Sequence, residues 1–549
     1  MSQIKKFFMN ENTVIVNLTS NLCVTSSEIL DSSGFKKVVS KFLLTIGDNS
    51  RRPLQTIKTI NKSPDEMVEL FKLLVVFQFD EIISKHSRFK KYLTYRKEIA
   101  EFIEALYSYW LNLERYGIVQ RRLVEINTDN SIMIESTDSF SKNILSLYRF
   151  FLKKLLDKPI RINRQTPAGF SAGFIVTPEF YQFPPKYKFF KGINIVSGVV
   201  MRTPFIGHSS SNSRTGTFQE IDYNPLNYLR MTKRHWFCFP IKVGELLAYV
   251  FFHRTLMHHG VALCNTFEPG IEDYYKGRKP DLVYVYGGLK QEEDCTYYID
   301  KENDFYLGYV ARNEKNDFFG YMKDMILNLH NVYMIKHNIL PIHGAMVNIV
   351  TKGNHEKNIV VIGDNNAGKS EIFKALKFID NQKIVEMNVI FDNMGIFCLK
   401  DGSVCAKGTE IGAYMMLDDL KTGYAYEELD RAIFINPESN VPKIILSNTR
   451  YEFISRENKI DYVFYANNSK DSDVSIRIFN DINEMLKVFQ EIELTDITGS
   501  SESKTLLEDV FSVMFKNKIS FGELYTKPGI SEEENKGNIT AARSIVDLL

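Results

Sequence analysis

Eight consecutive residues in the second half of the chain carry its clearest chemical pattern. Positions 363–370 read Gly-Asp-Asn-Asn-Ala-Gly-Lys-Ser. The two glycines permit backbone angles that turn successive amides toward one point, the lysine adds a mobile positive charge, and the serine offers a hydroxyl group to Mg²⁺. This GxxxxGK[ST] spacing is typical of loops that bind the phosphate chain of a nucleotide. The residues expected to bind it are Gly363, Asp364, Asn365, Asn366, Ala367, Gly368, Lys369, Ser370 and Glu371.

Such a loop needs a strand before it and a helix after it. The apolar run at 358–362 predicts a buried strand, and 371–378 favours a helix whose N-terminal dipole would face the phosphates. A second predicted strand, 343–350, precedes them across a polar turn at 352–357. Because strand, loop and helix follow in the required order, we favour a nucleotide site over the alternative, a glycine-rich turn with a surface lysine.

A helix is expected immediately upstream. Asp317 is placed to cap it, and Pro341 to end it. Its apolar stripe would consist of Met322, Met325, Ile326, Leu329 and Tyr333.

The histidine at the start of the 343–350 strand, followed by this loop, resembles two related families. One is HPr kinase/phosphorylase: Asp364 and Glu371 of this chain match residues of the glycine-rich loop in that family. The other is phosphoenolpyruvate carboxykinase, in which the histidine binds a transition metal. The further segments similar to the carboxykinase are Gly320–Lys323 (its GEMKK), Phe391–Phe397 (its WDDDGVF), Ala406–Lys407 (its YAK) and Asn448–Arg450 (its ENTR). The resemblance covers about 315–460.

The resemblance implies a site that departs from the family pattern. The family's pair of aspartates falls on Glu386 and Met387, so one carboxylate remains, and its metal-binding lysine falls on Asp324. Its substrate-stacking tyrosine falls on Phe318, and its GRSPKDK substrate loop has no counterpart. These departures argue against binding oxaloacetate in the family's manner.

The remaining residues suit phosphoryl transfer. His343, Asp324 and Glu386, with the Ser370 hydroxyl, would form a hard set of ligands for Mg²⁺ or Mn²⁺. Lys369 and Arg450 would neutralise charge on the phosphoryl group of ATP or GTP. The expected catalytic residues are His343, Lys369, Glu386 and Arg450.

A basic segment precedes this region. Residues 161–235 contain ten Lys and Arg against three acidic residues, and Arg202 and Arg214 flank a loop at 207–213 rich in small hydrogen-bond donors. This loop could hold an anionic acceptor, with Lys407 as a further substrate contact; a solvated basic face is the alternative. The histidines of 253–259 could be metal ligands, but no carboxylate or cysteine lies at a supporting spacing, so structural histidines are favoured.

In the first 155 residues, the sequence pattern predicts a strand at 13–18 followed mostly by helices. Ser63-Pro64 reads as a helix cap, and helical spacing continues over 92–116. This region is either a helical packing domain or a module that binds a protein partner.

The whole chain predicts a mixed α/β protein in three parts: a helical region at 1–155, a β-rich carboxykinase-like domain on the substrate side at 156–310, and a P-loop kinase domain at 311–549. A net charge of +1 argues against nucleic acid, and no apolar run is long enough for a membrane span. Six scattered cysteines and no secretory signal favour the cytoplasm.

Three functions are consistent with these patterns. The first is a nucleotide-dependent phosphotransferase acting on a small hydroxyl compound or a protein serine. The second is a phosphoenolpyruvate carboxykinase. The third is a catalytically silent nucleotide-binding regulator.

Overall fold

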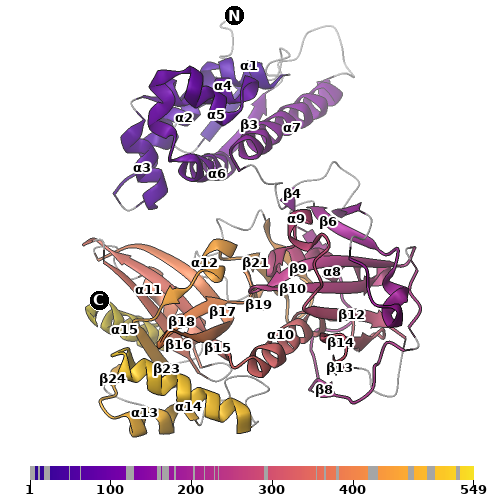
Figure 1. Cartoon of the computed structure of the whole chain (residues 1–549). Helices are drawn as coiled ribbons and strands as arrows, with labels where there is room; N and C mark the ends of the chain where they lie inside the picture. Colours follow the sequence, from indigo (N-terminus) through magenta and orange to yellow (C-terminus); the bar gives the residue numbers. More distant parts are fainter. Residues whose placement is uncertain are drawn as a thin grey trace, which may run out of the picture. The chain divides into compact units, whose positions relative to one another are not determined.

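The chain folds into two compact units, residues 1–160 and 161–549. Both units are seen in the computed structural model of the chain (Figure 1). The residues that the structure describes are 7–9, 13–17, 25–48, 50–61, 63–118, 129–156, 162–163, 172–177, 181–201, 205–215, 217–227, 229–232, 234–289, 295–353, 355–363, 367–378, 383–417, 431–467, 475–490, 501–526 and 532–548. Helices and several sheets together make it a mixed α and β protein.

Unit 1 is mainly helical and carries one small sheet. The sheet has the order β1-β2-β3. Its elements are β1 (Phe7–Met9), β2 (Thr13–Asn17), α1 (Ser26–Asp31), α2 (Ser33–Thr45), α3 (Arg52–Ile60), α4 (Pro64–Val76), α5 (Phe79–Lys85), η1 (Ser87–Tyr92), α6 (Arg96–Asn112), β3 (Glu114–Ile118) and α7 (Asp129–Leu156). A large apolar cluster fills the space between these helices, and a smaller one surrounds Val14 and Leu113.

Two local predictions can be checked in unit 1. The cap is confirmed, since Ser63 Oγ accepts from the Glu66 amide and Pro64 is the first residue of α4. The helix predicted over 92–116 extends too far at its C-terminal end, because α6 ends at Asn112 and β3 begins at Glu114. The backbone of Glu114 pairs with Thr13, so the chain leaves the helix to extend the sheet, and this pairing overrides helical periodicity.

Unit 2 begins with a ten-stranded sheet in the order β4-β6-β9-β10-β12-β14-β13-β8, with β5 beside β6 and β11 beside β9. Its elements are β4 (Ile162–Asn163), β5 (Ala172–Thr177), η2 (Pro185–Phe190), β6 (Asn194–Met201), β8 (Gln219–Glu220), β9 (Trp236–Val243), β10 (Leu246–His253), η3 (Arg254–Leu256), α8 (Met257–Thr266), β11 (Glu268–Pro269), α9 (Glu272–Tyr275), β12 (Leu282–Gly288), β13 (Cys295–Asp300) and β14 (Phe305–Ala311). A four-stranded sheet, β19-β21-β20-β7, lies in the same unit.

An eight-stranded sheet carries the loop region, in the order β22-β18-β17-β15-β16-β23-β25-β24. The remaining elements of unit 2 are β7 (Phe205–Gly207), α10 (Phe319–Lys336), β15 (Leu340–Thr351), β16 (Glu356–Ile362), α11 (Lys369–Phe378), β17 (Ile384–Lys400), β18 (Ser403–Gly408), β19 (Gly412–Met416), β20 (Ile433–Ile435), β21 (Lys443–Ser447), α12 (Tyr451–Ser455), β22 (Asn458–Lys459), β23 (Tyr462–Asn467), β24 (Ile476–Ile478), α13 (Ile482–Gln490), α14 (Ser501–Lys516), β25 (Ser520–Tyr525) and α15 (Glu532–Leu548). Helices α11 and α15 pack on one face and α13 and α14 on the other, so the sheet is buried on both sides (Figure 1).

Helix α10 joins the two large sheets. The apolar cluster around it contains Tyr284 of β12 and Met394 of β17, so one core spans both. The expected cap and stop of this helix are wrong. Its N-cap is Phe318, without a side-chain hydrogen bond, because the Asp317 carboxylate is bonded elsewhere. The helix ends before Asn338, which has a φ of 57°, and Pro341 lies inside β15.

His330, buried in α10, makes the stability of unit 2 sensitive to acid. Burial lowers its pKa from 6.5 to about 4, with Asn331 opposing the shift. The unfolded chain therefore binds a proton before the folded chain does, and stability is lost as the pH falls from 6.5 toward 4. We expect His330→Leu to remove about 3 kcal/mol of this loss by pH 4. Urea unfolding at pH 7 and pH 4 measures it, and an unchanged pH dependence in the variant would contradict the assignment.

In the part of the chain that the structure describes, no helix combines the length and apolar character that crossing a membrane requires.

Candidate functional site

The glycine-rich loop connects the end of β16 to the start of α11. A Cβ at Gly363 would lie 3.0 Å from the Ala466 carbonyl oxygen, and Gly368 has a φ of +81°, so both positions need glycine. Lys369 is buried, and its Nζ donates a hydrogen bond to the Gly363 carbonyl at 2.9 Å. Asp364, Asn365 and Asn366, and the side chains of Ser370 and Glu371, lie outside the described residues. The strand, loop and helix thus follow in the predicted order.

His343 lies beside this loop. Strands β15 and β16 are antiparallel, with Gly344 opposite Ile362, so the start of β15 adjoins the end of β16. Side chains alternate along a strand, so His343 shares the face of Ala345 and Val347, which packs against α11. Burial, with the Lys369 and Lys323 ammonium groups nearby, lowers the pKa of His343 to about 3. The imidazole is therefore neutral at physiological pH.

Three further polar side chains complete this group. Asn393, in β17, forms a hydrogen bond with His343 and donates from Nδ2 to Glu410 Oε1 at 2.7 Å. Lys323 of α10 places its Nζ 3.2 Å from Glu410 Oε2. Glu410 is fully enclosed, and burial raises its pKa, which Lys323 and Asn393 counteract. Asn393 has a φ of 135°, a strained backbone angle of the kind that occurs at functional sites.

Glu386 does not join this group. It lies opposite Val350 in the register of β15 and β17, whereas His343 lies opposite Met394. Seven residues of β15 separate the two positions, about 23 Å at 3.3 Å per residue. Asn388 Nδ2 donates to the Glu386 carboxylate at 3.0 Å. The prediction that Glu386 shares a cation with His343 is therefore wrong, because β17 is one continuous strand that carries Glu386 to the opposite end of the sheet.

Asp324, the other predicted carboxylate ligand, pairs with Arg214, whose Nε lies 2.9 Å from Asp324 Oδ2. Lys407 is also engaged, with Nζ 3.0 Å from Glu245 Oε2. Arg202 lies outside the described residues. The predicted metal set of His343, Asp324 and Glu386 is thus not assembled.

Arg450 is the N-cap residue of α12. The backbone amides of Asn448 and Thr449 both donate to the Ile411 carbonyl, at 3.0 and 3.1 Å. Ile411 follows Glu410 directly, so the Asn-Thr-Arg segment is fixed to the chain that supplies the buried carboxylate. The backbone just before Arg450 is therefore attached to the residue that follows Glu410.

Sequence reasoning missed three members of this group: Lys323, Asn393 and Glu410. Lys323 and Asn393 lie in segments already singled out for their resemblance, but neither was given a role. Glu410 carries no sequence signal, since a single acidic residue after a strand is usually a solvated one. Its burial at 2% exposure is what distinguishes it.

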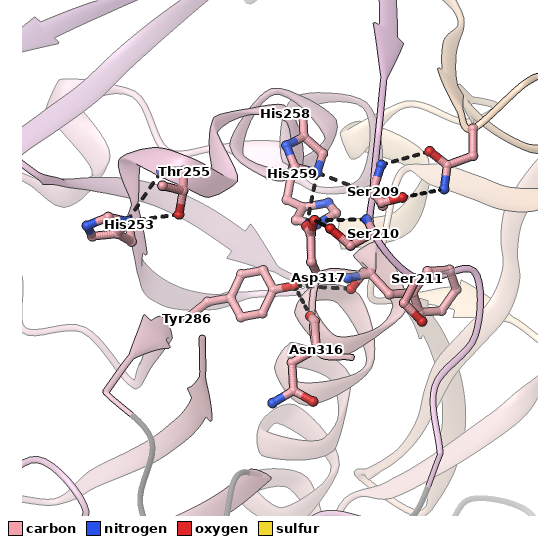
Figure 2. Close-up of polar contacts among 12 residues, drawn as sticks. Ser209, Ser210, Ser211, His253, Thr255, His258, His259, Tyr286, Asn316 and Asp317 are labelled. Carbon is pink, nitrogen blue, oxygen red and sulfur yellow. Dashed lines mark hydrogen bonds and ion pairs between the residues drawn. The ribbon is translucent and has the colours of Figure 1, made fainter. Parts of the chain in front are cut away.

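A second cluster lies in unit 2, around Asp317. His258 Nε2 and His259 Nε2 lie 3.3 and 2.9 Å from Asp317 Oδ1. The amide and hydroxyl of Ser210 donate to Oδ2, at 2.9 and 2.8 Å (Figure 2). Although burial opposes it, hydrogen bonds from both histidines and Ser210 hold the pKa of Asp317 well below its usual value. The donor-rich loop at 207–213 thus binds a carboxylate of its own chain.

This cluster places two of the histidines at 253–259 beside a carboxylate. The carboxylate that sequence spacing did not supply comes from 58 residues downstream of His259. His253 is separate: it is bonded to Thr255 (Figure 2) and to Arg312.

Comparison of the chain with models of known protein families and with characterised proteins found no match.

Proposed function

We propose that unit 2 transfers the terminal phosphoryl group of ATP or GTP to a hydroxyl-bearing acceptor, with the fold of a divergent carboxykinase-superfamily kinase domain. The observation that carries this proposal is the placement of His343 beside the loop lysine, on the face of the sheet from which α11 rises. Two buried ammonium groups, Lys369 and Lys323, lie near one neutral imidazole. A site with two buried ammonium groups favours an anion with several oxygen atoms, and the triphosphate group of a nucleotide is such an anion.

The residues present suit positioning and charge neutralisation rather than covalent catalysis. Loop amides and Lys369 would hold the β- and γ-phosphates, and the His343 imidazole would donate a hydrogen bond to a phosphoryl oxygen. The acceptor oxygen forms a bond to the γ-phosphorus while the bond from that phosphorus to the β–γ bridging oxygen breaks. The hydroxyl proton passes to solvent, and the nucleoside diphosphate leaves with the bridging oxygen. Mg²⁺ or Mn²⁺ would enter with the nucleotide, whose oxygens supply most of its ligands, so a preformed set of protein carboxylates is not required.

The acceptor would reach the site from the segment 205–215. Arg214 is held at Asp324, the residue after Lys323, which places this segment against the same end of α10. Tyr414 lies near Asp324, and its ring is 6.1 Å from that of Phe318, so this side of Asp324 is aromatic. A small hydroxyl compound or a serine side chain would fit there better than oxaloacetate. The carboxylates of oxaloacetate would compete with Asp324 for Arg214.

The test is nucleotide turnover with product identification. Purified protein would be incubated with ATP or GTP, Mg²⁺ or Mn²⁺ and candidate acceptors, and ³¹P NMR would identify the products. We expect slow formation of nucleoside diphosphate and no phosphoenolpyruvate from oxaloacetate. Efficient phosphoenolpyruvate formation would instead identify a carboxykinase. Tight MgATP binding without turnover would identify a nucleotide-dependent regulator, and absence of binding would refute the nucleotide site.

A further inference from the structure

We propose that His258, His259 and Asp317 form a binding site for a divalent transition metal of the zinc type, independent of the nucleotide site. Two imidazole nitrogens and one carboxylate oxygen are a donor set that suits zinc, and three protein ligands leave a position for water or substrate. These side chains come from the start of α8 and from the residue before the α10 N-cap. Among the described residues, they are the only group of three or more such side chains close enough to share an ion.

The spacing of the donor atoms matches a coordination shell. His258 Nε2 and His259 Nε2 lie 3.3 and 2.9 Å from Asp317 Oδ1, and all three atoms lie within 4.8 Å of one another. In a tetrahedral zinc site with bonds of about 2.0–2.1 Å, neighbouring ligand atoms are about 3.3 Å apart. The two nitrogen–oxygen distances would therefore need to change by no more than a few tenths of an ångström to match such a site.

The direction of the side chains supports the same interpretation. Consecutive residues of a helix point about 100° apart and do not normally face each other. His258 and His259 nevertheless converge on one oxygen atom, with ring centroids 3.8 Å apart (Figure 2). The other carboxylate oxygen of Asp317 is fixed by two donors from Ser210. A metal-binding carboxylate is commonly oriented in this way by hydrogen bonds to its second oxygen.

A catalytic Ser-His-Asp arrangement does not fit this geometry. Ser209 Oγ lies 3.4 Å from His258 Nε2, the same nitrogen that contacts Asp317. A histidine acting as a general base holds the carboxylate on Nδ1 and the serine on Nε2. The Ser209 hydroxyl, or a water molecule, would instead supply a fourth ligand to a bound ion.

The site should be of moderate affinity. His259 Nδ1 is buried and has no hydrogen-bond partner among the described residues. A metal-bound imidazole usually donates this second nitrogen to an acceptor, and loss of such a partner weakens binding roughly 10- to 100-fold. We therefore expect affinity in the micromolar range.

Calorimetric titration of the full, chelator-treated chain with Zn²⁺, without nucleotide, tests the proposal. We expect one ion per chain, with binding weakened at least about tenfold in His258→Gln and Asp317→Asn. Titration with Co²⁺ supplies a second readout, because its visible absorption reports a tetrahedral environment of nitrogen and oxygen ligands. Circular dichroism verifies that the variants fold. The two substituted residues, His258 and Asp317, are the partly exposed members of the cluster, whereas His259 is buried.

Two matched histidine variants serve as controls. His253→Gln removes an imidazole five residues away that is bonded to Thr255 and Arg312, and His343→Gln removes the one beside the glycine-rich loop. Both should bind Zn²⁺ like the parent. Absence of binding in the parent, equal binding in His258→Gln, or loss of binding only in His343→Gln would each overturn the proposal. Because the titration contains no nucleotide, its result is independent of phosphotransfer.

Discussion

Replacing Lys369 by Ala is expected to weaken MgATP binding roughly 10- to 150-fold. The change removes one charge-assisted hydrogen bond to the phosphate chain, about 1.5–3 kcal/mol, and leaves the loop amides to hold it alone. Lys369 is already buried and turned to the Gly363 carbonyl, so the side chain needs only a small rearrangement to reach a bound phosphate. Calorimetric titration with MgATP measures the loss.

Lys352→Ala is the matched control, because it removes the same charge from the exposed turn between β15 and β16, at the opposite end of the sheet from the loop. It should bind MgATP like the parent. NMR titration of His343 provides an independent readout of the site geometry. The Lys369 ammonium group contributes to the low pKa of His343, so this pKa should rise in Lys369→Ala. Unchanged affinity and unchanged pKa would together refute the site.

Local patterns predicted the elements that hold the loop. The apolar runs at 343–350 and 358–362 form β15 and β16, and the helix follows the loop, because each of these is encoded by neighbouring residues. Mixed α and β architecture followed from the same patterns. The carboxykinase-like layout and the three-part division of the chain stay predictions.

Contacts between distant residues could not be predicted in this way. Glu410 contacts Lys323, which lies 87 residues earlier in the sequence, and Asp317 contacts His259, which lies 58 residues earlier. The Glu386 prediction failed for a related reason. The family pattern places Glu386 at the end of a short strand, whereas β17 runs from Ile384 to Lys400 and its register with β15 shifts between Met346 and Val347. Strand length and register decide which end of a sheet a residue reaches, and both depend on tertiary pairing.

Because of this register, we expect His343→Gln to slow nucleotide turnover strongly and Glu386→Gln to leave it unchanged. His343 lies beside Lys369 and would donate a preorganised hydrogen bond to the phosphoryl group, and loss of one such donor costs roughly 100- to 1,000-fold in rate. Glu386, about 23 Å along the sheet, should be replaceable without effect on turnover.

Both substitutions exchange one polar side chain for glutamine, so initial rates of nucleoside diphosphate release at saturating ATP and Mn²⁺ compare them directly. Circular dichroism confirms that each variant folds. A large rate loss in Glu386→Gln would mean that the strand is paired differently in solution and that the carboxylate does reach the loop. Equal rates in both variants and the parent would move catalysis away from His343, since a neutral imidazole beside the buried Lys369 and Lys323 would then contribute nothing to the transition state.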